Sequence, residues 1–287
     1  LGKTHLLGEL RRRATERGVT FVYVDMTDVR SFDHTLLLGL ADSLTREVEG
    51  VSQLRHVIAA LFVEAEDISG RSATLAQGLE YAAEVATLGE NDLRGATKVM
   101  VDALWQRHRT RFTHPSLDVI RALMGMNNEA CLRIWSLASA WLQGSKVDDF
   151  DGMQLGLVQC EPDPGHLIQG IFRMLSFRGP TLMAFDQLDN CFPLLDAARH
   201  APDREEGKTA KLVLGDIGKG FGALRDRLNS STLTVVACFG DTWDHLKKLV
   251  PASFADRYTE PHRLLPVSES SIARDLVERR LDAARGS

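Results

Sequence analysis

The tripeptide Gly2-Lys3-Thr4 constrains the fold of this chain most, because an apolar helical run follows it at once. It matches the second half of the phosphate-binding pattern G-x-x-x-x-G-K-[ST], in which backbone N–H groups and a helix N-terminus surround phosphate groups. Leu1 takes the last x position, so we expect a longer chain that supplies the first glycine and the strand before it. A tripeptide also arises by chance, and its meaning depends on whether a nucleotide-binding sheet follows.

Three later segments, residues 19–26, 181–185 and 232–239, have the apolar and β-branched composition of buried parallel strands. Helical patterns separate them, which is the βαβ order of a parallel sheet, and residues 262–267 would add a last short strand. The sequence therefore predicts an α/β fold of the P-loop NTPase type, with a parallel sheet flanked by helices.

The segment between the first two strands is too long for a single crossover helix. Apolar residues recur at i, i+3 or i+4 in four predicted helices, at 52–67, 72–88, 92–112 and 115–142. The sequence thus predicts a large all-helical insertion. Its core would contain three tryptophans, Trp105, Trp135 and Trp141.

The balance of charges limits the kinds of partner that the whole surface could attract. The 287 residues carry 34 Lys+Arg against 39 Asp+Glu, a formal net charge of −5, which excludes a basic field over the whole molecule. Two local basic clusters, residues 11–13 and 107–111, leave DNA contact open, the alternative being a solvated helix face.

The cysteine and hydropathy patterns indicate the compartment. The four cysteines (131, 160, 191 and 238) are far apart and form no C-x-x-C pair, so we expect reduced thiols. No apolar run approaches the ~20 residues that cross a bilayer, and the first residues show no signal-peptide pattern. We expect a cytoplasmic protein with no membrane contact.

An acidic sequence, Asp186-Gln187-Leu188-Asp189, follows the second predicted strand. Ligands of open parallel sheets bind at the carboxyl ends of the strands, where Asp186 would lie. A carboxylate there could hold Mg²⁺ opposite the hydroxyl of Thr4. The alternative is a carboxylate that only caps the next helix.

The order of these features resembles the AAA+ and STAND-like P-loop ATPases. The resemblance is closest to the branch of the origin-recognition (Orc-type) and KAP-type ATPases, in which the Mg²⁺-binding strand ends in D-E-x-D or D-D-x-D. It covers residues 1–46 and 166–284 and leaves out the helical insertion.

The resemblance implies a nucleotide site at the start of the chain. Gly2, Lys3, Thr4 and His5 would form the remaining part of the Walker A loop, with Lys3 on the β- and γ-phosphates. Thr4 and the Walker B residue Asp186 would hold the metal. The implied cofactors are ATP and Mg²⁺.

The resemblance also implies residues that act on the γ-phosphate. Asp241 or Thr242 would occupy the sensor position, which orients the attacking water. Arg257 falls where such ATPases place an arginine that reaches a neighbouring subunit's nucleotide; its alternative is a surface ion pair with Asp256 or Glu260. The implied partners are further copies of the chain or another protein in a larger complex.

The catalytic base is the point at which this sequence departs from the pattern. Gln187 stands where many relatives have a glutamate, and an amide is a poor general base. Either Asp189 takes that role, or hydrolysis is slow and the protein is a nucleotide switch. Asp189 could equally cap the turn that follows.

We therefore expect three regions: an N-terminal part of the ATPase core (1–50), the helical insertion (51–145), and a C-terminal part of the core with the start of a lid (146–287). The leading function is an ATP-binding, ATP-hydrolysing module that drives assembly or conformational change in a larger machine, in a DNA-associated or antiviral-defence setting. The alternative is a catalytically degenerate scaffold that docks partner proteins through the insertion. A small-molecule kinase fits the D-Q-L-D strand end and the Arg257 loop least well.

Overall fold

The computed structural model describes residues 2–68, 72–110, 112, 114–191, 194, 196–197, 200, 203–228, 231–249 and 262. In chain order its elements are α1 (Lys3–Glu16), β1 (Thr20–Asp25), α2 (Phe32–Thr45), β2 (Glu47–Val48), β3 (Val51–Ser52), α3 (Gln53–Ile68), α4 (Leu75–Ala86), α5 (Glu90–His108), α6 (His114–Met126), α7 (Leu132–Leu142), α8 (Asp149–Leu155), α9 (Pro164–Arg178), β4 (Thr181–Asp186), η1 (Leu188–Cys191), α11 (Glu205–Arg227), β5 (Thr232–Val236) and α12 (Gly240–Leu249).

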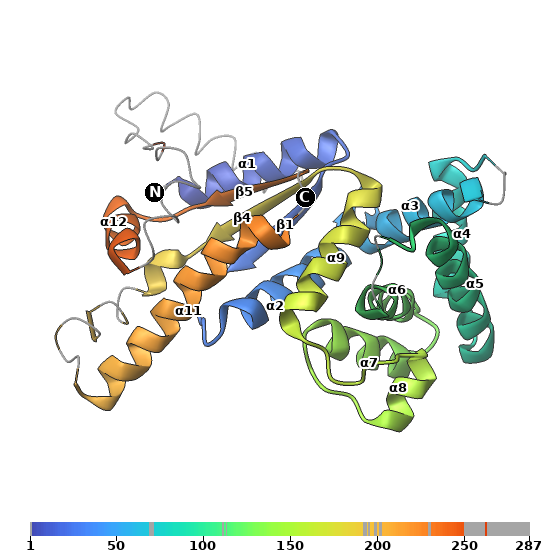
Figure 1. Cartoon of the computed structure of the whole chain (residues 1–287). Coiled ribbons are helices and arrows are strands. Elements are labelled where there is room, and N and C mark those ends of the chain that lie inside the picture. The colour runs from blue at the N-terminus through green and yellow to red at the C-terminus, as the bar shows by residue number, and fades with distance from the viewer. Residues whose placement is uncertain are drawn as a thin grey trace.

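The main sheet has three parallel strands in the order β1-β4-β5 (Figure 1). Thr20 pairs with Thr181 and Asp25 with Asp186, so β1 and β4 begin and end level with each other. Thr181 also pairs with Thr232 of β5. The prediction of an α/β fold with a parallel sheet flanked by helices is confirmed at this level. The third strand ends at Val236 rather than at Phe239, because the chain enters α12 at Gly240.

Helices cover both faces of the sheet (Figure 1). On one face, Leu7 and Ala14 of α1 pack against alternate strand residues, among them Phe21 and Ala184. On the other face, α2, α9 and α11 pack against the intervening residues, such as Phe185. Successive side chains of a strand point to opposite faces, and these apolar residues account for the two-sided burial of β4.

The helices from α3 to α8 form a separate layer at one end of the sheet (Figure 1). The helix predicted over 115–142 is two helices, α6 and α7, and this part of the prediction is wrong. Asn128 explains the break: its amide donates to the carbonyls of Val85 (3.1 Å) and Leu88 (2.9 Å), and its oxygen accepts from the N–H of Cys131 (2.9 Å). Asn128 thereby ties the break to the end of α4.

Two further elements lie where no helix or strand was expected. Residues 146–165 resemble a loop in composition, yet α8 forms there, because Asp148 caps its first turn and Gly156 (φ 73°) ends it. The β2–β3 hairpin turns through Glu49 (φ 54°) and Gly50 (φ 78°), the positive φ values of a tight hairpin turn.

The tryptophans of the helical layer are core residues, as predicted. Trp141 is 2% exposed, and its indole N–H donates to the carbonyl of Gln159 (2.9 Å). Trp105 and Trp135 are partly buried and pack against the same core. No helix in the described ranges is both long enough and apolar enough to cross a membrane.

Candidate functional site

The N-terminus of α1 lies at the carboxyl ends of β4 and β5 (Figure 1). There the ammonium group of Lys3 forms an ion pair with Asp189, which follows β4. Lys3 also lies 3.5 Å from the centroid of the Phe239 ring, in cation–π geometry. The fold thus joins three segments that are far apart in the sequence: the start of α1, the turn after β4 and the loop after β5.

Asp189 is the carboxylate that holds these segments together. Besides its ion pair with Lys3, it accepts hydrogen bonds from the N–H of Phe239 (2.6 Å) and the hydroxyl of Thr242 (2.9 Å) on Oδ1. The turn that positions it passes through Gln187, whose φ of 62° is in the left-handed region that side chains other than glycine rarely adopt. Because both carboxylate oxygens already accept hydrogen bonds, this arrangement favours a positioning role for Asp189 over that of a general base.

Asp186 is the buried carboxylate of the site. It ends β4 with 2% of its surface exposed. Its Oδ2 accepts a hydrogen bond from the hydroxyl of Tyr23 (3.3 Å), and its Oδ1 accepts one from the N–H of Gln187 (2.8 Å). Burial, and next the charges of Asp186 and Asp25, raise the pKa of Tyr23 to about 12. The Tyr23 phenol therefore stays protonated and remains a donor to Asp186 at neutral pH.

A polar rim connects the end of β1 to η1. Asp25 accepts hydrogen bonds from both the N–H (2.9 Å) and the hydroxyl (2.5 Å) of Thr27. The side-chain amide of Asn190 in turn donates to the Thr27 hydroxyl (3.2 Å). These bonds hold the ends of β1 and β4 next to each other, with Asp25 beside Asp186.

The predicted phosphate-binding residues occupy the first turn of α1. Gly2 precedes the helix with φ 111°, a left-handed conformation that glycine adopts without strain. Thr4 and His5 follow Lys3 and are exposed. Their side chains are therefore accessible to a ligand.

The predicted sensor residues lie in a helix rather than in a loop after a strand. Asp241 and Thr242 are in the first turn of α12, where Asp241 is exposed and Thr242 is 2% exposed. Thr242 reaches the site through its bond to Asp189. Arg257 lies outside the described residues, as do the last predicted strand, apart from His262, and the start of the lid.

The residues predicted to hold Mg²⁺ are Asp186 and Thr4. Within the described ranges, no group of three or more His, Cys, Asp or Glu side chains could hold an ion. Mg²⁺ usually takes one or two carboxylates and completes its shell with waters and phosphate oxygens. Both oxygens of Asp186 already accept hydrogen bonds, from Tyr23 and from the N–H of Gln187, so the binding of Mg²⁺ by Asp186 and Thr4 stays a prediction.

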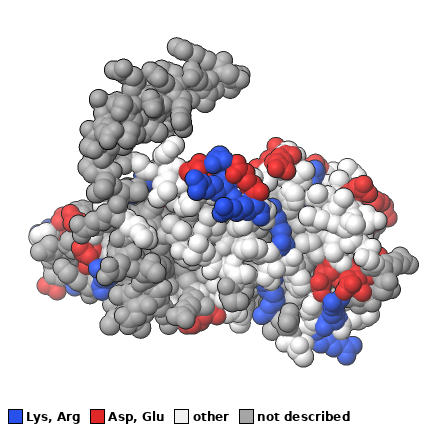
Figure 2. Space-filling view, turned by 90° about the horizontal axis from the view of Figure 1, so that it is seen from above, with Lys and Arg blue, Asp and Glu red and all other residues white. Residues whose placement is uncertain are grey.

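Arginines of both basic clusters form ion pairs with neighbouring acids. On α1, Arg12 pairs with Glu9 (2.7 Å) and also with Glu16. Arg107 pairs with Glu64 (3.2 Å) and with Asp67. Figure 2 shows basic and acidic side chains in small mixed groups on the face seen from above. Less positive charge is therefore free for nucleic acid than the sequence suggests.

Sequence reasoning missed two residues of the site, Tyr23 and Phe239. Tyr23 precedes the strand end by two residues, so it shares a face with Asp25, and the register of β1 on β4 then places it beside Asp186. Phe239 was assigned to a strand, whereas it lies before α12 and its ring contacts Lys3. Both residues are aromatic, and both lie within three residues of a strand end.

Comparisons with protein-family models, with curated proteins and with solved structures give no match for this chain. The geometry of the site and the motif residues are therefore the basis for a functional proposal.

Proposed function

We propose that the protein is an ATP-binding, ATP-hydrolysing module of the AAA+/STAND-like class, whose nucleotide state drives assembly or conformational change in a larger complex. One observation carries this proposal: Lys3, at the N-terminus of α1, lies against Asp189 at the carboxyl ends of the parallel strands. A helix N-terminus with a lysine, opposite an acidic strand end, is the arrangement that phosphate-binding loops use.

The roles of the residues follow from their positions. The N–H groups at the start of α1 and the ammonium of Lys3 bind the phosphates, which replace Asp189 as the partner of Lys3. Asp186 and Thr4 hold Mg²⁺, which neutralises charge on the β- and γ-phosphates when bound. Phosphoryl transfer to water needs mainly positioning and charge neutralisation, and these groups can supply both.

The same geometry supports slow turnover. Gln187 offers an amide in the place of a general base, and the oxygens of Asp189 are occupied by donors from α1, Phe239 and Thr242. The protein then acts as a nucleotide switch, with Arg257 completing the site of a neighbouring copy.

Turnover of Mg²⁺-ATP by the full-length natural protein tests this function. Asp186→Asn removes the buried charge but keeps the shape, and it should abolish Mg²⁺-dependent phosphate release. Asp102→Asn changes an exposed carboxylate on α5 and should leave the rate unchanged. Equal rates for Asp186→Asn and the unmodified protein would exclude this site as the ATPase centre.

A second candidate is a scaffold that does not hydrolyse nucleotide. The occupied Asp189 and the Gln187 amide favour it, because both weaken the case for catalysis. In that case partner proteins dock on the helical layer α3–α8, and ATP binding with no turnover would be the expected result.

A further inference from the structure

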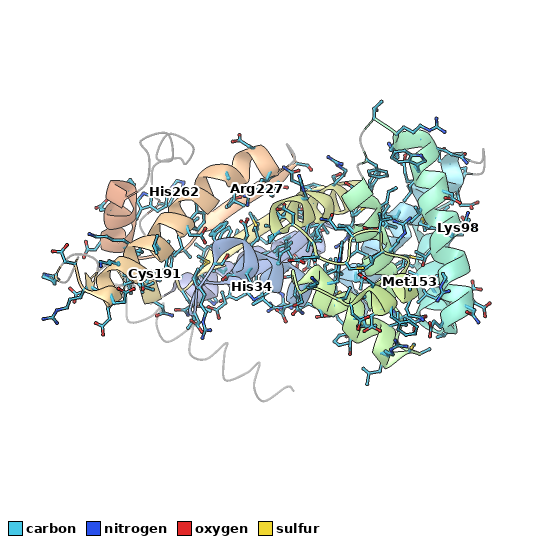
Figure 3. All side chains as sticks on the ribbon, turned by 60° about the horizontal axis from the view of Figure 1, so that its bottom comes forward. His34, Lys98, Met153, Cys191, Arg227 and His262 are labelled. Atoms are coloured by element: carbon cyan, nitrogen blue, oxygen red, sulfur yellow. The ribbon has the colours of Figure 1, made fainter. Side chains whose placement is uncertain are left out.

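A cleft of about 620 Å³ lies at the junction between the sheet domain and the helical layer. Its walls are the last turn of α11, one side of α9, and Thr110 and Phe112 from between α5 and α6. Figure 3 labels Arg227, which lines the cleft from the end of α11. At this end of the sheet, α9 leads into β4 and α11 leads into β5. The cleft therefore lies at the amino ends of these two strands. The candidate nucleotide site lies at the opposite ends of the same strands.

One wall of the cleft is aromatic. Phe112 and Phe172 are nearly fully buried, and Phe177 is partly buried. The rings of Phe112 and Phe177 lie 6.1 Å apart at 60° to each other. This wall is a continuation of the core, and the partly buried ring of Phe177 is the part of it that a ligand could contact.

Arg173 is the unusual polar group in the cleft. One nitrogen of its guanidinium, Nη1, donates to the hydroxyl of Ser116 (3.0 Å). Burial lowers its pKa. Within the described part of the chain it forms no ion pair with a carboxylate. A partly buried cation without a counter-charge is unfavourable, and an anion that binds beside it recovers part of that free energy.

The second arginine of the cleft is different, because its charge is already balanced. Arg227 forms an ion pair with Asp33 at the start of α2 (2.5 Å). The positive charge available to a ligand is therefore that of Arg173.

We propose that this cleft is a second ligand site, which binds a small organic anion: a carboxylate or phosphate group on an aromatic or aliphatic body. The anionic group pairs with Arg173, and the body lies against Phe112 and Phe177. The inference does not depend on nucleotide binding. A ligand here would contact α9, the helix that continues into β4 and so into Asp186.

The test uses anilinonaphthalene sulfonate, an aromatic anion that fluoresces in apolar surroundings, titrated into the full-length protein. Phenylnaphthylamine, which has the same rings without the sulfonate, is the neutral probe. We expect saturable binding of the anionic dye at one site, weakened about tenfold by Arg173→Gln, since one charge-assisted bond is lost. Binding of the neutral probe should change much less.

Two matched variants locate the dye. Arg55→Gln removes a half-buried arginine that pairs with Glu129 elsewhere, and it should have no effect. Lys3→Ala should likewise leave dye binding unchanged, which separates this cleft from the candidate nucleotide site. An unchanged dye affinity in Arg173→Gln, or loss of dye binding in Lys3→Ala, would overturn the proposal.

Competition on the unmodified protein keeps the test independent of whether Arg173→Gln folds. Phenyl phosphate and benzoate should displace the dye, whereas benzyl alcohol, which has the same ring without the charge, should not. Equal displacement by benzyl alcohol would show an apolar site without anion recognition and would refute the role of Arg173.

Discussion

Lys3 and Asp189 form an ion pair that joins the first residue of α1 to the turn after β4. Their side chains are 22% and 14% exposed, so the pair is largely shielded from water. In this state Asp189 balances the charge of the lysine that would bind phosphate. If the proposed function holds, nucleotide competes with a carboxylate of the protein itself, which suits a switch better than a fast enzyme.

The network around Asp189 predicts a large effect on stability. Asp189→Ala leaves the Phe239 N–H, the Thr242 hydroxyl and the Lys3 ammonium without their acceptor. We expect a loss of about 2 kcal/mol or more in the free energy of unfolding, measured by urea denaturation. Asp189→Asn keeps one acceptor oxygen and should lose less. As a control, Asp42→Ala removes an exposed carboxylate that forms an ion pair with Arg46. A comparable loss of unfolding free energy in Asp42→Ala would refute this prediction.

The raised pKa of Tyr23 predicts how the free energy of unfolding depends on pH in the alkaline range. Its pKa rises from 10.0 to about 12 in the folded protein, so the protonated phenol stabilises the fold fully below pH 10. That contribution is lost as the pH rises from 10 towards 12. The pKa of Tyr81 is also raised to about 12, so its ionisation lowers the free energy of unfolding over the same pH range.

Urea denaturation at several pH values checks this. The free energy of unfolding should fall with rising pH in this window, and less steeply in Tyr23→Phe than in the unmodified protein. Tyr81→Phe is the matched comparison, because it removes a second partly buried phenol and leaves the hydrogen bond of Tyr23 to Asp186 in place. If the free energy of unfolding falls equally steeply with pH in Tyr23→Phe and in the unmodified protein, Tyr23 is not the source of this pH dependence.

Two glycines of α11 predict opposite effects of the same substitution. A Cβ on Gly220 would lie 2.1 Å from the Phe32 ring, which is buried against Phe185 just before Asp186. Gly220→Ala should therefore destabilise by about 1–3 kcal/mol. Gly215 has open space at its Cβ, so Gly215→Ala should stabilise by up to about 1 kcal/mol through helix propensity. Thermal unfolding distinguishes the two, and a stable Gly220→Ala would show that α11 packs differently.

The sequence was sufficient to predict the three strands of the main sheet and to place Lys3 near their carboxyl ends. The strand runs are apolar and β-branched, and the carboxyl ends of parallel strands meet at one edge, so Lys3 and Asp186 could be assigned to the same region. The contact of Tyr23 with Asp186 could not be predicted, because it depends on the register of two strands whose contacting residues are 163 positions apart in the sequence. Asn128 and Phe239 were missed for a related reason: their roles depend on tertiary partners, the end of α4 and Lys3.

Equilibrium binding of Mg²⁺-ATP to the full-length natural protein, measured by calorimetry, tests the central claim most directly. Lys3→Ala should weaken binding by about 10- to 100-fold, because it removes a charge-assisted contact to phosphate. Lys98→Ala removes an exposed lysine on α5 that pairs with Asp102 and should leave the affinity unchanged. Failure of the unmodified protein to bind ATP, or equal affinities for Lys3→Ala and Lys98→Ala, would contradict a nucleotide site at the start of α1.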